Sequence, residues 1–462
     1  MKTIIKKNHL AFVIPAKAGI YNQILDSCLR RNDNRFLFYS LFNTLKLAIG
    51  ILIFIFSLKV SAQEKLSLEE CYTLVNKNYP LAKQQDLLTK QNELDLAVIK
   101  TEKLPTLDFS AQATYQSDVI KLPITIPGVT IESPNKDQYK ATVSVSQLIY
   151  SRGLINANLE AKSAHLKTQQ KQVEVNLYQL KEQVNQLYFS ILLLQEKKVL
   201  LVAKKTQLET TLKEVKAGVK YGMLLPASDS VLEAELLKIA QQFTEIDLNK
   251  ISLVETLSTL IGQPISTKIH LENPIISNNL GTELKRPELD LFNLQKNQIE
   301  ASEQLLAKKN SPKLMGFATG GYGNPGLNML DNSFQSYYIT GLKINWNIFD
   351  WNANKTARKS LKINKEIIDN QQEVFTLNTT IELNQQLTEI NKISSFIASD
   401  KTIVELRKQI LKSAKSQLKN GVITSSAYIT ELTNLFEAEN NLNTHKIQLL
   451  LAKANFKTTK GN

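Results

Sequence analysis

The segment YKATVSVSQLIY, from Tyr139 to Tyr150, alternates apolar and polar side chains as far as Ser146. The apolar members of the alternation are Tyr139, Ala141, Val143 and Val145, and the polar members are Lys140, Thr142, Ser144 and Ser146. Successive side chains of a β-strand point to opposite faces of the sheet. The segment therefore predicts a strand with one apolar and one polar face.

Three more segments have strand character. PTLDFSAQATYQ, at 105–116, alternates as regularly as the first segment. YYITGLKINWNIFDW, at 337–351, alternates clearly, whereas SPKLMGFATGGYG, at 311–323, is richer in glycine and weaker. We therefore predict β-hairpins at 105–150 and 312–350.

Long stretches without glycine or proline surround these hairpins. They span 154–217, 227–261, 351–420 and 422–460. The first of them would form a helix about 96 Å long at about 1.5 Å per residue, which exceeds the size of a globular core. Apolar residues recur along the stretches at heptad spacing, as at Leu201, Leu208 and Val215. This spacing predicts helices that pack along their length.

The chain repeats this plan. Tyr150 corresponds to Phe349, and Gly222 corresponds to Gly421, both at an offset of 199 residues. Each half reads helix, strand, strand, long helix, break and helix, which is a two-fold internal repeat. The predicted organisation is a first repeat over 63–262, a linker over 263–286 and a second repeat over 287–462.

The first 62 residues have a different character. LKLAIGILIFIFSLKVSAQ contains a positive flank at Lys46, a short apolar run and a small-residue site before Gln63. These are the three parts of a secretory signal, which we predict at 41–62. Residues 1–40 precede the signal, and FVIPAKAGIYNQILDSCLRRNDN resembles the translation of a bacterial intergenic repeat. We expect 1–40 to be a non-native extension.

Composition argues against several functional classes. The net charge is +13, and the first 62 residues contribute +7 of it, with nine Lys and Arg against two Asp. The remaining +6 is spread out, with no basic block interleaved with aromatic residues, so nucleic-acid binding is not indicated. The cysteines are Cys28 and Cys71, and the histidines His9, His165, His270 and His445 are scattered. No metal-ligand spacing and no nucleophile–base set is discernible. We expect no enzyme activity, no metal and no cofactor.

Ten-residue strands with an apolar and a polar face, preceded by a secretory signal, are typical of outer-membrane β-barrels. Four strands cannot close such a barrel, because the unpaired backbone groups of an open edge are costly in lipid. Several copies would therefore share one wall, and three copies would supply twelve strands. The alternative is a periplasmic protein whose two hairpins lie on its own helices.

The order of these features resembles that of the TolC-like outer-membrane efflux proteins. The resemblance rests on LSLEECYTLVNKNYPLAKQQ at 66–85, on the turns LIYSRG at 148–153 and NIFDWN at 347–352, and on the doubled plan. It implies a mainly α fold with a membrane β-barrel portion. A homotrimer would share a 12-stranded barrel, four strands per chain, above a long α-helical barrel.

The resemblance also implies a function. The protein would be the outer-membrane channel of a tripartite efflux or type I secretion system in a Gram-negative bacterium. It would act as a passive duct across the outer membrane, with its helices in the periplasm, where they meet an adaptor and an inner-membrane pump. The alternative is the periplasmic coiled-coil adaptor, or membrane fusion protein, of the same machines, although that class has one helical hairpin rather than two.

Candidate site residues fall into three sets. The helical breaks at the periplasmic tip, which the resemblance assigns to gating and adaptor contact, carry Tyr221, Gly222, Asp229, Asn420 and Gly421. Polar strand positions that would line the pore are Asp108, Gln112, Lys140, Lys343 and Asn345. The aromatic residues where strand becomes helix are Tyr150, Trp346, Phe349 and Trp351, and they would either mark the membrane interface or plug the junction between barrel and helices.

The residues near the two helical breaks predict the charge of the tip and the start of the helix after the first break. The second half has Ala427 where the first has Asp229, so we expect no symmetric acidic constriction. Ser230 and Glu233 have the spacing of a capping box, which predicts that the helix after the first break begins there.

Overall fold

The computed structural model describes residues 65–121, 127, 133–276 and 283–461. Residues 63–462 form one compact unit. The predicted extension at 1–40 and the predicted signal at 41–62 lie outside the described residues, and the predicted linker includes residues 277–282, which are also outside them.

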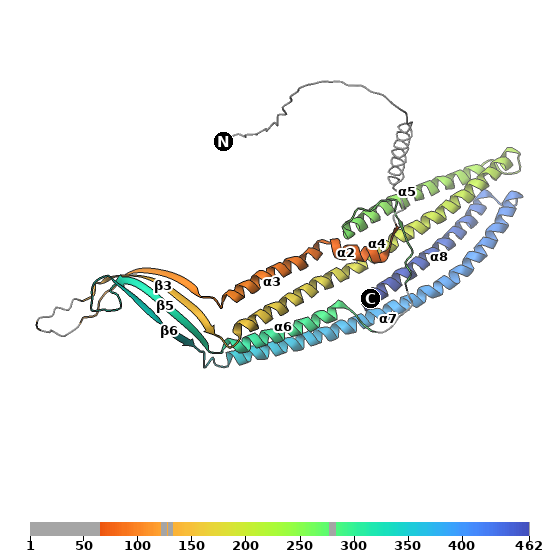
Figure 1. The fold of residues 1–462 in the computed structure, drawn as a ribbon. Coiled ribbons are helices and arrows are strands. Elements are labelled where there is room, and N and C mark those ends of the chain that lie inside the picture. Colours follow the sequence, from red (N-terminus) through yellow and green to blue (C-terminus); the bar gives the residue numbers. More distant parts are fainter. Residues whose placement is uncertain (1–64, 122–126, 128–132, 277–282, 462) are drawn as a thin grey trace, which may run out of the picture. The chain divides into compact units, whose positions relative to one another are not determined.

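In the first half of the unit, helices come before and after a β-hairpin in the sequence, and Figure 1 shows the strands at one end of the unit and the helices extending away from them. Its elements in chain order are β1 (Lys65–Leu66), α2 (Leu68–Asn78), the 3₁₀ turn η1 (Pro80–Ala82), α3 (Lys83–Thr101), β2 (Thr106–Tyr115), β3 (Asp137–Tyr150), α4 (Leu154–Lys220), α5 (Ser228–Ile261) and β4 (His270–Leu271). The predicted alternation between strand and helix is present.

The second half repeats this arrangement. Its elements are α6 (Pro287–Lys309), β5 (Lys313–Asn324), β6 (Gln335–Asn345), α7 (Ala353–Lys419) and α8 (Ser425–Lys460). Helices α4 and α7 each contain 67 residues, and both of their ends differ by the predicted offset of 199. The prediction of a mainly helical, internally repeated fold with four antiparallel strands is confirmed.

Left-handed residues mark equivalent junctions in the two halves. Arg152 and Gly153 precede α4 with φ of 50° and 78°, and Trp351 and Asn352 precede α7 with φ of 55° and 60°. A non-glycine residue in this region is uncommon. The two strand-to-helix turns therefore have the same backbone conformation, although the first uses a glycine and the second an asparagine.

The four long strands form one antiparallel sheet in the order β2-β3-β5-β6. Directly paired residues share a face, and the register pairs Phe109 with Val143 and then Val143 with Gly320. Strands β2 and β6 each have one neighbour, so each has an unpaired edge. A second, two-stranded parallel sheet pairs β1 with β4.

The long helices pack side by side. Helix α4 packs against α5, α6 and α8, and α7 packs against α6 and α8. The predicted heptad residues Leu201, Leu208 and Val215 are buried between α4, α5 and α8, together with Leu232 and Leu432. At about 1.5 Å per residue, the 67 residues of α4 span about 100 Å.

Two further findings concern individual helices. The predicted capping box at Ser230 is wrong: α5 begins at Ser228, and its N-cap Ala227 makes no side-chain cap. Within the described residues, none of the helices combines the length and the apolar character that a membrane span requires.

Candidate functional site

The sheet gathers the predicted polar strand residues on one face. Lys140 pairs directly with Gln112, and Asp108 pairs with Ser144, further along β3. In β6, Lys343 and Asn345 pair with Met315 and Lys313 of β5. Alternation along the strands puts all five candidates on the same side of the sheet.

Neutral hydrogen bonds connect neighbouring strands across this polar face. The hydroxyls of Thr106 and Ser146 lie 2.8 Å apart, and those of Ser144 and Thr319 lie 2.9 Å apart. Such ladders of hydroxyl groups suit a surface in contact with water rather than an apolar core. The face therefore has the character expected of a solvated wall.

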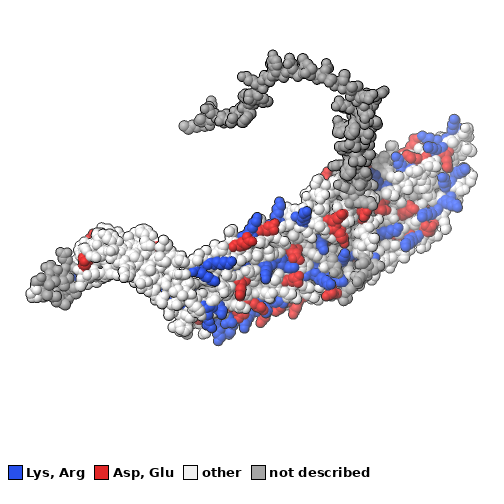
Figure 2. All heavy atoms as spheres, in the orientation of Figure 1, with Lys and Arg blue, Asp and Glu red and all other residues white. Residues whose placement is uncertain are grey.

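The opposite face is apolar and uncovered. Large side chains on it are strongly exposed, including Leu107 at 70%, Phe109 at 72%, Tyr338 at 80% and Leu342 at 68%. On the side seen in Figure 2, charged side chains are sparse over the strands and dense over the helices. A continuous exposed apolar surface of this kind marks an interaction with a membrane or a partner.

Aromatic residues occur at both ends of the apolar face. At the helical end, Tyr150, Trp346, Phe349 and Trp351 are all exposed, and the rings of Phe349 and Trp351 lie 4.8 Å apart between centroids.

At the far end, Phe334 stacks on Tyr139 and Tyr322, with centroid separations of 6.3 and 5.5 Å. The sequence did not single out this second cluster, because Phe334 lies before β6 rather than in it.

The two tip turns have nearly the same backbone geometry. Gly222 and Gly421 both have φ of 71°. The amide of Met223 donates to the carbonyl of Gly218 over 2.8 Å, and the amide of Val422 donates to that of Gln417 over 2.9 Å. Left-handed glycines with these bonds are the Schellman-type ends of helices α4 and α7.

The turns also lie next to each other. A Cβ on Gly421 would sit 3.4 Å from the carbonyl oxygen of Met223. A cleft of about 360 Å³ lies beside the turns, and its wall includes Met223, Leu224, Leu418 and Asn420. Of the predicted tip residues, only Asn420 lines this cleft, whereas Tyr221, Gly222, Asp229 and Gly421 do not.

Asp229 lies in the first turn of α5, where it accepts a hydrogen bond from the amide of Ser230 over 2.9 Å. This is the position in which a carboxylate is favoured by a helix N-terminus. Its charge also contributes, after the Glu233 hydrogen bond and charge, to a raised pKa of Lys216. The contacts of Asp229 are therefore those of a helix end.

The second tip is basic. Between Lys408 and Glu431 the chain carries Lys412, Lys415 and Lys419 and no acidic residue. Lys415 reaches α4, where its ammonium lies 3.6 Å from the Glu214 carboxylate.

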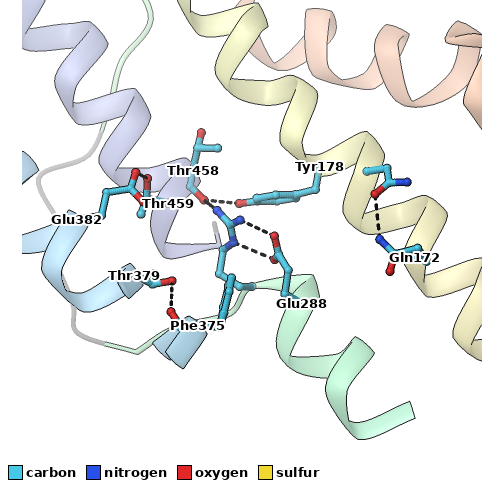
Figure 3. A network of polar contacts seen from close by, with 10 residues as sticks. Gln172, Tyr178, Glu288, Phe375, Thr379, Glu382, Thr458 and Thr459 are labelled. Atoms are coloured by element: carbon cyan, nitrogen blue, oxygen red, sulfur yellow. Dashed lines mark hydrogen bonds and ion pairs between the residues drawn. The ribbon is translucent and has the colours of Figure 1, made fainter. Parts of the chain in front are cut away.

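A polar network fixes the C-terminal end of α8 (Figure 3). Arg286 binds both carboxylate oxygens of Glu288, at 2.9 and 2.5 Å, and its guanidinium lies 5.1 Å from the Tyr178 ring centroid. Both Arg286 and the Tyr178 hydroxyl donate to the carbonyl of Thr458, at 3.4 and 2.7 Å. The network joins α4, α6 and α8, and the sequence did not reveal it.

Two stripes of exposed apolar residues run along the outer helices. The α7 stripe consists of Ile363, Ile367, Val374, Leu377, Ile381, Phe396, Ile403, Leu406 and Ile410. The α3–α5 stripe consists of Leu87, Leu94, Val98, Leu237, Leu248 and Ile251. Neither stripe belongs to a buried cluster, so each is a surface that a partner could cover.

Metal-binding chemistry is sparse. Among residues 65–121, 133–276 and 283–461, no three His, Cys, Asp or Glu side chains are grouped as metal ligands. His445 Nδ1 lies 2.6 Å from the Asp400 carboxylate, which joins α8 to α7 rather than forming a site open to substrate.

One family model matches part of the chain. Residues 84–263 match the family model of the outer membrane efflux proteins. No curated protein matches the sequence.

Solved structures match nearly the whole described fold. VceC of Vibrio cholerae is 14% identical, with a TM-score of 0.62, and the match covers 86% of this chain and 96% of VceC. CmeC of Campylobacter jejuni is 17% identical, with a TM-score of 0.59 and 85% of each chain covered. The open state of MtrE from Neisseria gonorrhoeae is 16% identical, with a TM-score of 0.59 and coverage of 86% and 89%.

Proposed function

We propose that the chain is a member of the outer membrane efflux protein family, whose model matches residues 84–263, and that three copies form a passive export channel through the outer membrane. The channel carries cargo from the periplasm to the exterior and performs no chemistry. Its energy comes from an inner-membrane pump, to which a periplasmic adaptor connects it. The observation that carries the proposal is the four-stranded sheet, with two unpaired edges and an uncovered apolar face.

The two unpaired edges of the sheet would each pair with a strand of a neighbouring copy. An unpaired edge strand leaves N–H and C=O groups without partners, at a cost of several kcal/mol each in lipid. Pairing β6 of one copy with β2 of the next removes every edge when the ring closes. Three copies supply twelve strands, within the range of known outer-membrane barrels.

The helices support the same ring. Within one copy, the helices farther from the strands lie side by side in the order α5, α4, α8 and α7, so α5 and α7 are the outermost helices there. Nearer the strands the order is α3, α4, α6 and α7, so α3 and α7 are the outermost helices. Each flank carries one apolar stripe, and head-to-tail contact between copies would cover both stripes.

The aromatic clusters support the orientation in the membrane. Tyr and Trp side chains prefer the two boundaries between lipid and water. The apolar face has one cluster around Trp346 and Trp351 and another around Tyr139 and Phe334. The lipid core would lie between them, with the polar face turned to the pore and the helices in the periplasm.

Single cysteines at neighbouring positions on β2 test this arrangement. Phe109→Cys and Ser110→Cys would each be made with Cys71→Ala, and the outer-membrane fraction would be labelled. We expect the Phe109→Cys variant to react with a membrane-soluble maleimide and to resist a charged aqueous one. The Ser110→Cys variant should show the reverse, and both should migrate as trimers in mild detergent. Equal aqueous labelling of the two variants in a soluble monomer would contradict the proposal and favour hairpins that lie on the helices.

A further inference from the structure

The charged residues of the sheet are distributed unequally between its faces. The four long strands contain five charged residues, which are Asp108, Asp137, Lys140, Lys313 and Lys343. Lys140, Lys343 and Asp108 lie on the polar face, as the register shows. Lys313 pairs with Asn345 and lies two residues from Met315, the partner of Lys343, so it belongs to the same face. Asp137 pairs with Tyr115 on the other face.

The polar face therefore carries three lysines against one aspartate, a net charge of +2 per chain. Within the part of the chain that the structure describes, none of the four takes part in an ion pair. Side-chain hydroxyls and amides make up most of the remaining polar groups on this face. Its positive charge is thus not neutralised by neighbours.

One of the lysines is held in place by its surroundings. The hydroxyl end of the Tyr337 ring lies over Gly321, since a Cβ there would be 2.4 Å from the ring carbon Cζ. The Lys140 ammonium lies 5.6 Å from the centroid of the same ring. This cation–π contact keeps the charge on the polar face, near the end of the strands remote from the helices.

The lysines occupy both ends of the face. Lys140 lies in the row of Gln112, Gly323 and Gln335, whereas Lys343 lies in the row of Leu148 and Met315. Eight residues of β3 separate these rows, which is about 27 Å at about 3.4 Å per residue. Asp108 lies between them, so a solute crossing the barrel meets positive charge first and last.

We propose that this face makes the pore selective for anions, so that the favoured cargo is a negatively charged small solute. The inference rests on the proposed function, since only a closed ring turns the polar face inward. Twelve strands about 4.8 Å apart and tilted by about 40° give a backbone diameter of about 24 Å. Lysine side chains about 6 Å long then place their charges about 6 Å from the axis, within the Debye length of about 8 Å.

Reversal potentials across planar bilayers under a KCl gradient test the inference. We expect the purified trimer to prefer chloride over potassium by about two- to fourfold. The triple variant Lys140→Gln, Lys313→Gln, Lys343→Gln should abolish the preference, and the Lys343→Gln single variant should reduce it in part if the triple variant does not assemble. Asp108→Asn is the matched control of opposite sign, and it should increase the preference.

The basic tip is the competing source of selectivity. Lys412→Gln, Lys415→Gln, Lys419→Gln removes the same number of charges there and should leave the chloride preference within a factor of about 1.5. Loss of the preference in the tip variant but not in the barrel variant would overturn the inference, as would a preference for potassium in the unmodified channel. A membrane-inserted trimer without any conductance would instead contradict the proposed channel itself.

Discussion

Cys71 shows how completely the core near the start of the unit is closed. The side chain has no exposed surface and packs among residues of α2, α4 and α5. Burial, followed by the neighbouring charge of Glu70, raises the pKa of the Cys71 thiol to about 12. Since the thiolate is the reactive form, the native protein should resist maleimide at pH 7 and react after unfolding in urea.

The matched control lies two residues away. Thr73 is exposed on the same helix, so Thr73→Cys combined with Cys71→Ala should react within minutes in the folded protein. Rapid labelling of Cys71 in the folded protein, located by peptide mass, would show that this core opens readily.

Glu439 is an acidic residue on the packed side of α8. Burial raises the pKa of its carboxyl above the ordinary value of 4.5, an effect that the charge of Lys408 opposes and that of Glu405 adds to. Because the pKa of Glu439 is higher in the folded than in the unfolded chain, the ionised carboxylate lowers the free energy of unfolding at a pH above both pKa values. This destabilisation disappears as the pH falls below the pKa of the unfolded chain, where the carboxyl is protonated in both states. We therefore expect Glu439→Gln to raise the Tm by about 1–2 °C at pH 7.5 and to have no effect near pH 4.

Glu437→Gln serves as the control, because this neighbouring glutamate is exposed. It should leave the Tm unchanged at both pH values. An equal effect of the two substitutions at pH 7.5 would mean that net charge, rather than burial of Glu439, determines the result.

At the residue scale, the sequence predicted side-chain faces better than side-chain partners. Alternation alone grouped Asp108 with Gln112 on one face of β2, because the period of a strand is fixed by its backbone, and the register of the structure places Lys140 of β3 on the same face. It gave no sign that Arg286 would meet Thr458, since these residues are brought together only by the packing of α4, α6 and α8. Lys313 was overlooked because its strand is glycine-rich and its alternation weak.

At the scale of secondary-structure elements, the ends of the helices were the feature that the sequence predicted best. Glycines at 222, 262, 421 and 461 all adopt positive φ, and they lie at the ends of α4, α5, α7 and α8. The wrong start predicted for α5 has a physical reason: its N-cap Ala227 provides no side-chain acceptor, whereas Thr424 caps α8 by accepting from the amide of Ala427. Strands β1 and β4 could not be predicted, because two residues each carry no periodicity.

The tip glycines allow a test of what the turns do. A Cβ on Gly222 would meet nothing within 4 Å, so a substitution there acts through the backbone rather than through a clash. Valine in this left-handed conformation costs about 1–2 kcal/mol, whereas asparagine is tolerated. We expect Gly222→Val with Gly421→Val to reduce efflux at least about fivefold in whole cells while the trimer still assembles.

Gly222→Asn with Gly421→Asn is the matched control and should retain most of the efflux. If the valine and asparagine variants transport equally well, the left-handed turns are only helix ends. If the valine variant fails to assemble, the turns support folding rather than coupling or gating.

At the scale of the whole molecule, one copy has two complementary flanks. The edge strand β2 follows α3, and the edge strand β6 is followed by α7, so each flank of the helices continues into an edge of the sheet. The heptad pattern predicted which residues pack, but it could not separate those buried within one chain from those buried between chains. Val404 and Leu406 are both apolar residues of α7, yet Val404 is buried within the chain and Leu406 is 54% exposed.

The last prediction concerns assembly, because the two apolar stripes are the surfaces that would be buried between copies. Burying a leucine side chain contributes about 2 kcal/mol, and one substitution acts at all three interfaces of a trimer. Leu377→Glu with Leu406→Glu would place two charges per copy in the α7 stripe. We expect this variant to elute as a monomer in mild detergent, as measured by light scattering. Its helices should keep their circular dichroism, because neither leucine belongs to a buried cluster within the chain.

Ala398→Glu is the matched control, since Ala398 is exposed on α7 but does not belong to the stripe. It should leave the trimer intact, and Leu248→Glu, on the opposite flank, should weaken it as the α7 substitutions do. This pairing of effects matters because a head-to-tail ring buries two different surfaces of every copy. A trimer that survived charges in both stripes would have to be held by the strands alone, and the helices would then be free to separate along their length.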